Sequence, residues 1–160
     1  MSQMSKEHRR CSLPNNDNNE VNYIVDQLQE AIICGQLNEI KVLSRTYDLN
    51  KYINFSDYAG RTSLHWAIWS QDSKIINFLI ENYDLSQSVN LQDVDGNTPL
   101  HLAVESGKFK IIKLLSNTYD LSPSINLQDY WGNTPLHYAI NNGDIEMVKF
   151  LIESNDSSFK

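Results

Sequence analysis

One four-residue motif occurs three times in this 160-residue chain, each copy starting 36 residues after the one before. The copies are Thr62-Ser63-Leu64-His65, Thr98-Pro99-Leu100-His101 and Thr134-Pro135-Leu136-His137. Self-similarity at a fixed period of this size is typical of a stacked repeat array. A Thr at the N-cap accepts a hydrogen bond from a backbone N–H of the first turn, and a Pro directly after it loses only an N–H that the helix cannot use. Each copy therefore predicts the start of a helix.

The same period holds for the apolar residues of two helices in each unit. From Val21 onward apolar residues follow helical spacing, which continues after Gly35 with Ile40, Val42 and Leu43. Alignment at the period gives four units, marked in the first helix by Ala31, Ala67, Ala103 and Ala139 and in the second by Leu43, Leu79, Leu115 and Leu151. The first unit lacks the Thr-Pro-Leu-His start, as expected of a terminal capping repeat.

A connecting segment with its own repetition follows the second helix of each unit. It begins at Tyr47-Asp48-Leu49, Tyr83-Asp84-Leu85 and Tyr119-Asp120-Leu121. A glycine, which adopts positive φ without steric cost, then marks a tight turn at Gly60, Gly96 and Gly132. The predicted order in each unit is helix, helix, loop and hairpin-like turn.

These residues resemble the ankyrin-repeat family, whose pattern runs Asp, two variable residues, Gly, one variable residue, Thr-Pro-Leu-His, one residue and Ala, with a Gly four residues later. The third and fourth units match it from Asp93 to Gly107 and from Asp129 to Gly143, and the second matches with Ser63 for Pro and Gln71 for Gly. The resemblance implies an all-α solenoid of about four helix pairs with short hairpin-like loops. The implied domain is residues 21–153, with repeats of about 21–56, 57–92, 93–128 and 129–153, between tails of residues 1–20 and 154–160.

The period departs from that family, whose usual repeat has about 33 residues. The extra residues of each interval fall between the second helix and the hairpin, in stretches such as residues 119–124. We expect them to form a loop, so that the stack of helices survives.

The resemblance also implies a structural role for the three histidines of the motif. In ankyrin repeats this His hydrogen-bonds near the Thr hydroxyl and ties neighbouring loops together. A metal site formed by His65, His101 and His137 is the alternative, but stacking separates these side chains by one repeat each.

The sequence contains no recognisable catalytic constellation. Cys34 has no Cys or His at metal-ligand spacing, and no Gly-rich loop follows a strand. Solvation explains the paired acids Asp93 and Asp95 at a turn. We therefore expect a protein that is not an enzyme and holds neither a metal nor a cofactor.

Ankyrin arrays bind proteins through a concave side built from the hairpin tips and the exposed part of the first helix. The repeat pattern leaves variable positions there, which in this chain are Tyr58, Ala59, Arg61, Val94, Asp95, Asn97, Tyr130, Trp131 and Asn133 at the tips, and Trp69, Ser70, Glu105, Ser106, Asn141 and Asn142 on the helices. Tyr, Trp and Arg are enriched at interface hot spots. We therefore expect protein binding at Tyr58, Arg61, Trp69, Asp95, Asn97, Glu105, Tyr130, Trp131 and Asn133.

A purely structural interpretation of the aromatic positions is also open. Tyr130 and Trp131 would then cover the neighbouring tip, and Trp69 would fill the space beside Trp66. If the positions bind, the acids Asp95 and Glu105 between the aromatic ends favour a partner with basic groups.

The net charge of −7 comes entirely from the repeat region, because the charges of residues 1–20 sum to zero. The basic stripe typical of nucleic-acid binders is absent from the sequence, so we expect no nucleic-acid partner. No apolar run approaches the roughly 18 residues of a membrane span, and Met1 to Arg10 lack the apolar stretch of a signal peptide. We expect no membrane association and a cytoplasmic location, which leaves the nucleus open as well.

Residues 1–20 are rich in Ser and Asn and lack periodicity, which predicts a disordered tail. Within it, Arg9-Arg10-Cys11-Ser12-Leu13-Pro14 resembles the sites of basophilic kinases and the phosphoserine ligands of 14-3-3 proteins. Ser12 is therefore a candidate phosphosite and a candidate 14-3-3 docking site, with a chance match in a tail as the alternative.

Two subgroups of the family and two interpretations of the C-terminal end remain open. The phrase from Arg61 to Ala67 is similar to the start of gankyrin-type proteasome assembly chaperones, and the inhibitors of Rel-type transcription factors also carry insertions in their repeats. After the last helix no polar capping repeat follows, so Leu136, Ile140 and Met147 are expected to leave apolar surface exposed. Either the chain is a truncated form of a longer array, or this end docks onto something.

Overall fold

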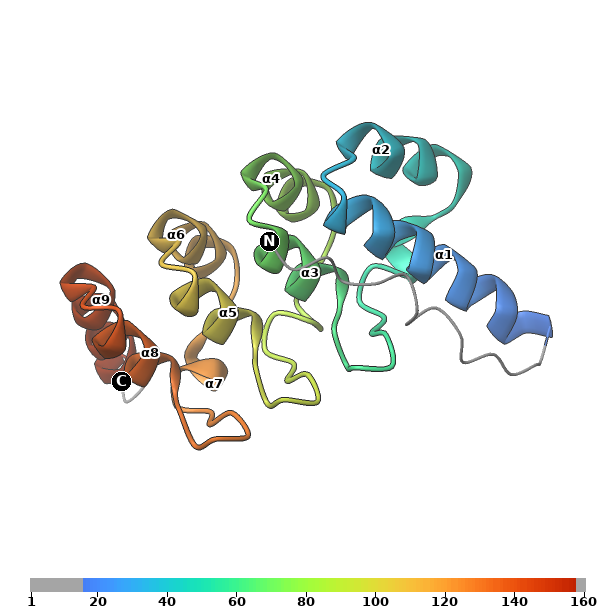
Figure 1. The fold of residues 1–160 in the computed structure, drawn as a ribbon. Helices are drawn as coiled ribbons and strands as arrows, with labels where there is room; N and C mark the ends of the chain where they lie inside the picture. Colours follow the sequence, from blue (N-terminus) through green and yellow to red (C-terminus); the bar gives the residue numbers. More distant parts are fainter. Residues whose placement is uncertain (1–15, 158–160) are drawn as a thin grey trace.

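The computed structural model describes residues 16–157, which form a curved stack of helices (Figure 1). In this range no strand forms, and one isolated bridge joins Ser56 to Thr62. The elements are α1 (Asn16–Ile33), α2 (Leu37–Thr46), the 3₁₀ turn η2 (Leu49–Lys51), α3 (Ser63–Ser70), α4 (Ser73–Asn82), α5 (Pro99–Glu105), α6 (Phe109–Thr118), α7 (Ser122–Ile125), α8 (Pro135–Asn141) and α9 (Ile145–Ser157). The all-α solenoid expected from the sequence is confirmed.

Each unit pairs an inner helix with an outer one. The inner row consists of α1, α3, α5 and α8, which contact one another in that order, and the outer row consists of α2, α4, α6 and α9. The long loops that precede α3, α5 and α8 all project from the same side of the stack (Figure 1). Residues far apart in the sequence therefore lie side by side along a row of loop tips.

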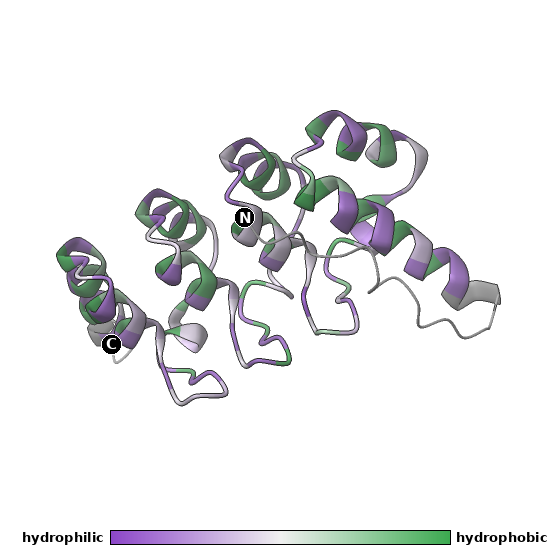
Figure 2. Ribbon diagram, viewed as in Figure 1, coloured by the Kyte–Doolittle hydropathy of each residue, from purple (hydrophilic) through white to green (hydrophobic). Residues whose placement is uncertain are grey.

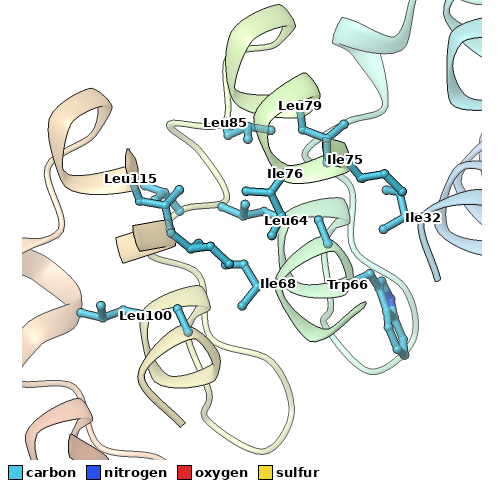
Figure 3. Packing of buried hydrophobic residues seen from close by; sticks show 14 of the residues in the cluster. Ile32, Leu64, Trp66, Ile68, Ile75, Ile76, Leu79, Leu85, Leu100 and Leu115 are labelled. Atoms are coloured by element: carbon cyan, nitrogen blue, oxygen red, sulfur yellow. The ribbon is translucent and has the colours of Figure 1, made fainter. Parts of the chain in front are cut away.

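A continuous apolar core runs between the two rows. Ile68, Ile75, Ile76 and Leu79 are completely buried in it (Figure 3). The apolar sides of the helices face one another, and the polar sides face outward (Figure 2). Fully burying one such side chain stabilises the fold by about 1.5–3 kcal/mol, and each repeat contributes side chains at the same positions.

Each copy of the sequence motif starts a helix, as predicted. Thr62, Thr98 and Thr134 are N-caps with extended backbones, and each forms a capping box with the histidine three residues on. The Thr side chain accepts the His backbone N–H, while the His ring accepts the Thr backbone N–H. Here histidine takes the place that Glu or Gln holds in most capping boxes.

The extra residues form a single helical turn in the first and third repeats and a turn at residues 86–90 in the second, rather than open loops. In the first repeat the turn is η2, and in the third it is α7. Asp120 lies before α7, and its carboxylate accepts a hydrogen bond from the Ser122 backbone N–H at 2.9 Å. Leu49, Leu85 and Leu121 point inward and are buried. The expectation that the extra residues lie outside the main helices and leave the stack intact is confirmed, but the segment is more ordered than a loop.

Side-chain hydrogen bonds join these turns from one repeat to the next. Asn54 donates to the Asp84 carbonyl at 2.9 Å and accepts from the Ser88 hydroxyl at 2.7 Å. One period later, Asn90 donates to the Asp120 carbonyl at 2.9 Å and accepts from the Ser124 hydroxyl. Each insertion therefore adds a polar connection between adjacent repeats.

The helix boundaries differ from the periodicity of the sequence at the start of the chain. α1 begins at Asn16, whereas apolar spacing begins only at Val21, because Asn19 and Glu20 are exposed and no apolar face marks the first turn. Val42 was expected among the apolar core residues of α2, but 49% of it is exposed. The candidate phosphosite Ser12 lies outside the described residues.

The last repeat exposes a different apolar set from the one expected. Met147 is completely buried in the core, so its expected exposure is wrong, and Leu136 is partly buried. Ile140 is exposed as expected, at 58%, and Ile145, which was not among the expected residues, is exposed at 69%. None of the helices in residues 16–157 is both long and apolar enough to cross a lipid bilayer.

Candidate protein-binding surface

Each of the three projecting loops is closed by an aspartate at its start. One carboxylate oxygen of Asp57 accepts the backbone N–H groups of Ala59 and Arg61, at 2.8 and 2.9 Å. Asp93 and Asp129 repeat the arrangement with the second and fourth residues after them. The tips are therefore held by local hydrogen bonds that the sequence pattern Asp-x-x-Gly provides.

Successive tips are also joined to one another through the backbone. The Val94 N–H donates to the Ala59 carbonyl at 2.9 Å, and the Tyr130 N–H donates to the Asp95 carbonyl at 2.8 Å. The contact is so close at Gly96 (φ +79°) that an added Cβ would lie 2.8 Å from the Asp129 Cα. The row of tips is one connected, rigid edge.

Two of the three motif histidines, His65 and His101, tie their inner helices to the next repeat. Thr62 donates its backbone N–H to His65 Nδ1, and Nε2 of the same ring lies 3.2 Å from the Asn97 carbonyl. Nε2 of His101 likewise lies 3.1 Å from the Leu127 carbonyl and 3.3 Å from the Asn133 carbonyl. Because Nδ1 accepts and Nε2 faces carbonyls, these contacts fit the neutral ring with its proton on Nε2.

Burial supports the same protonation state, since desolvation lowers the pKa of both His65 and His101. The ties that the family resemblance implied are thus present for His65 and His101, whereas the His137 ring is exposed and bonds within the described residues only to Thr134. Within the described residues no group of three or more His, Cys, Asp or Glu side chains is placed to hold a metal ion.

Arg61, predicted as a free binding residue, is engaged within the molecule. Its guanidinium donates to Asp93 at 3.3 Å and to Asp95 at 3.2 Å, and it lies over the Trp66 ring at 5.2 Å. Only 29% of its side chain is exposed. Arg61 and Asp95 therefore join two tips and partly neutralise each other.

In the fourth and second repeats a neutral side chain, rather than an arginine, donates the hydrogen bond to the tip aspartate. The Tyr138 hydroxyl donates to the second oxygen of Asp129, and the Trp66 indole does the same for Asp57 at 3.0 Å. Burial, followed by the hydrogen bond and charge of Asp129, raises the pKa of Tyr138 to about 12. The hydrogen bonds that Asp129 accepts outweigh its own desolvation and lower its pKa.

Four side chains project from the tips and are mostly exposed: Tyr58 (81%), Val94 (64%), Tyr130 (81%) and Trp131 (66%). We call these four residues the tip row. Tyr130 and Trp131 contact each other edge to face, with ring centroids 5.9 Å apart. Trp69 is half exposed and packs edge to face on Trp66 at 5.7 Å, in keeping with the structural interpretation of that residue.

The other predicted positions differ in how free they are. Glu105 is exposed, whereas the Asn97 and Asn133 carbonyls face histidine rings and their N–H groups close the tips. The Asn142 amide donates to the Val104 and Glu105 carbonyls at the end of α5. The sequence pattern did not reveal Tyr23, an exposed aromatic residue on α1, because α1 belongs to the first unit, which lacks the motif.

Charge is unevenly distributed between the two rows of helices. The inner helices and the tips carry one basic side chain, Arg61, within residues 19–155. Their carboxylates are Glu20, Asp26, Glu30, Asp57, Asp93, Asp95, Glu105 and Asp129. The pKa of Asp26 is raised by desolvation and by the charges of Asp57 and Glu30, so negative potential accumulates near the first tip. The lysines of the same range lie on the outer helices, on η2 and next to α6.

Comparison with known proteins identifies the repeat. A family model described as ankyrin repeats (three copies) matches residues 83–159, and a model of the single ankyrin repeat matches residues 59–94. Together the two matches cover more than half of the chain. Among curated proteins, a search finds no match to the sequence.

Proposed function

The chain belongs to the ankyrin-repeat family, and we propose that it is an adaptor or inhibitor that binds a partner protein through the tip row and the adjoining inner helices. Ankyrin repeats generally mediate protein–protein interaction, and proteins built from them are typically non-catalytic. The observation that supports this site is the exposure of Tyr58, Tyr130 and Trp131 along one edge.

Contiguous exposed apolar patches mark interaction sites, whereas apolar side chains exposed singly need no explanation. Tyr130 and Trp131 make no hydrogen bond through their side chains within the described residues, so the fold does not need their polar groups. Tyr and Trp dominate interface hot spots because they bury a large area with few rotatable bonds. We therefore expect these two residues to contribute most of the binding free energy at the proposed interface.

The rigidity of the tips also favours binding. Backbone hydrogen bonds between the tips and the ties from His65 and His101 fix their spacing before a partner arrives. Binding to a preformed surface avoids part of the entropy cost of ordering loops. We propose that Arg61, Asp95, Asn97 and Asn133 hold the tips in place. The residues that contact the partner directly are Tyr58, Glu105, Tyr130 and Trp131.

We propose that the partner presents a basic surface. The inner helices and tips carry several carboxylates against the single Arg61, which is already paired. Complementary charge speeds association and discriminates among partners, and its effect weakens with added salt.

A switch at Ser12 and a location in the cytoplasm or nucleus complete the proposal. Phosphorylation would add about −2 of charge to a segment with two neighbouring arginines and create a ligand for a 14-3-3 protein. Co-purification of a 14-3-3 protein with the wild type but not with Ser12→Ala supports the switch, and equal recovery from both contradicts it.

Site-specific photocrosslinking tests the binding surface. A photoreactive phenylalanine analogue placed at Trp131 or Tyr58 is expected to crosslink one protein in cells, and the same analogue at Val42 or Ile145 on the outer helices is not. Crosslinking from the outer positions alone would contradict the proposal. Proteasome-base ATPases among the products would favour the assembly-chaperone alternative, and Rel-type factors would favour the inhibitor of that class.

A further inference from the structure

A cavity of about 250 Å³ lies where the third and fourth repeats meet, between α6, α7 and α9. Its apolar walls include Leu121, Ile125 and Leu151. Ser116 and Tyr119 also line it. None of its lining residues belongs to the tip row, so the cavity is a separate feature of the surface.

The 36-residue period shows what fills the same place one repeat earlier. There the Tyr119 hydroxyl lies 3.3 Å from the Tyr83 carbonyl, to which it donates, and 3.2 Å from the Leu85 N–H, from which it accepts. Tyr83 and Leu85 are the repeat equivalents of Tyr119 and Leu121, which line the cavity. The phenol of a tyrosine thus ties the second repeat to the third.

The first interface uses a tyrosine as well. Tyr83 lies there near the hydroxyl of Ser44, which itself donates to the Lys41 carbonyl; Ser44 is the repeat equivalent of Ser116 in the cavity wall. At two successive interfaces a tyrosine therefore approaches groups whose equivalents line the cavity.

At the third interface the series is interrupted. The equivalent position holds Asn155, whose side-chain oxygen accepts instead from the Asn126 amide at 2.7 Å. Within residues 19–155 no group donates to the Tyr119 carbonyl or accepts from the Leu121 N–H. Leu121 is 6% exposed, so its backbone is largely withdrawn from water. The cavity therefore has the same backbone carbonyl and N–H that bond to a tyrosine hydroxyl one repeat earlier, but within the described residues no tyrosine hydroxyl bonds to them here.

We propose that this cavity receives the tyrosine side chain of a partner protein. A cavity of about 150 Å³ with apolar walls is known to admit benzene, so the volume here is sufficient for a phenol ring. A site with buried polar groups favours a ligand that pairs them over an analogue that lacks the hydroxyl. The proposal does not depend on the tip row, since the two sites share no residue.

The first test uses p-cresol, the side-chain analogue of tyrosine, and follows backbone amide signals by NMR. Saturable shifts are expected at Leu121 and Ser122, with a dissociation constant on the order of 1 mM for so small a ligand. The amides of Leu85 and Ser86 serve as an internal control, because Tyr119 already occupies their site. Toluene is expected to bind at least tenfold more weakly.

The substitution Asn155→Tyr restores the missing phenol and should weaken p-cresol binding at least tenfold. Equal binding of toluene and p-cresol, or equal binding to Asn155→Tyr and the wild type, would overturn the assignment. Toluene and p-cresol are compared on the unmodified chain, so this arm does not depend on the variant folding.

Three further arms identify the source of the tyrosine. A Gly-Gly-Tyr-Gly-Gly peptide should shift the same amides, and the peptide with Phe should not; failure of the tyrosine peptide would restrict the cavity to small phenols and overturn the proposal. Tighter binding of p-cresol to Phe159→Ser would mean that the chain's own end competes for the cavity. A doubled molecular mass in light scattering that Asn155→Tyr abolishes would mean that a second copy fills it, and either result contradicts a separate partner.

Discussion

At the scale of single residues, each tip aspartate uses its two carboxylate oxygens differently. One oxygen closes its own loop, and the other accepts from Trp66 in the case of Asp57 and from Tyr138 in the case of Asp129. The equivalent residue of the third repeat is Leu102, which has no donor, and Arg61 of the preceding tip supplies the hydrogen bond to Asp93 instead. Arg61 therefore replaces a missing hydrogen bond in the array.

Substitution of Gly96 by alanine should destabilise the array more than the same change at Gly132. Both glycines have positive φ, which costs a residue with a side chain roughly 1–2 kcal/mol. At Gly96 the added Cβ would also meet the backbone of the next tip at 2.8 Å, whereas at Gly132 no atom lies within 4 Å. The overlap should add about 1–3 kcal/mol to the loss in Gly96→Ala, measured by urea unfolding. Equal losses in the two variants would show that the tips are not in close contact.

Stability should fall as pH decreases below the pKa of an unfolded histidine, near 6.5. The folded-state pKa of His65 and of His101 is lowered by burial, so the unfolded chain takes up protons first. The contribution of these two histidines to the free energy of unfolding is therefore complete above pH 6.5. It is lost progressively as the pH falls toward the folded-state pKa, by up to roughly 1.4 kcal/mol per pH unit for each histidine.

The double variant His65→Gln/His101→Gln is the control for this pH dependence. Glutamine at this position can complete the capping box but does not titrate. Urea unfolding between pH 7.5 and 5 should give a flatter profile for the variant. A slope that persists unchanged would assign the pH dependence to other groups.

At the scale of elements, the inserted turns join each repeat to the next. Their Leu residues enter the core, and Asn54 and Asn90 each bond to two groups of the following repeat. The longer period thus adds interface to each pair of repeats. In solenoids the stability depends on such contacts between neighbours.

Replacement of Asn90 by alanine should cost roughly 1–3 kcal/mol, because it leaves the buried Ser124 hydroxyl without its acceptor and removes the bond to the Asp120 carbonyl. Asn126 is the matched control, since it is exposed and, within the described part of the chain, its side chain bonds only to Asn155. Asn126→Ala should change the free energy of unfolding by less than about 0.5 kcal/mol. Thermal and urea denaturation of both variants measure the difference, and equal effects would mean that the insertions do not stabilise the interfaces.

The helix starts and the period were predictable because their causes are local. A Thr cap, a Pro after it and an apolar period each act within a few residues, so the sequence pattern identifies them. The pairing of Arg61 with Asp93 and Asp95 was not predictable, because it joins tips more than thirty residues apart through side chains that vary between repeats. The start of α1 at Asn16 was missed for the opposite reason, since an exposed polar turn has no periodicity to detect.

At the scale of the whole molecule, the stack separates two kinds of surface. The inner helices and tips are acidic and carry the exposed rings of the tip row, whereas the lysines lie elsewhere in the described part of the chain. A partner that docks there would contact several repeats at once, since the tips lie side by side in Figure 1. The cavity between α6, α7 and α9 offers a second point of contact.

The affinity for the crosslinked partner, measured by calorimetry with tip-row variants, shows whether the tip row is the binding surface. Tyr130→Ala/Trp131→Ala should raise the dissociation constant at least tenfold, or about 1.4 kcal/mol, while leaving the midpoint of thermal unfolding nearly unchanged because both rings are mostly exposed. The control Val42→Ala/Ile145→Ala removes exposed apolar side chains from the outer helices and should change the affinity less than about twofold. If the outer-helix variant loses affinity and the tip-row variant does not, the binding surface lies on the outer helices and the tip row is not the site.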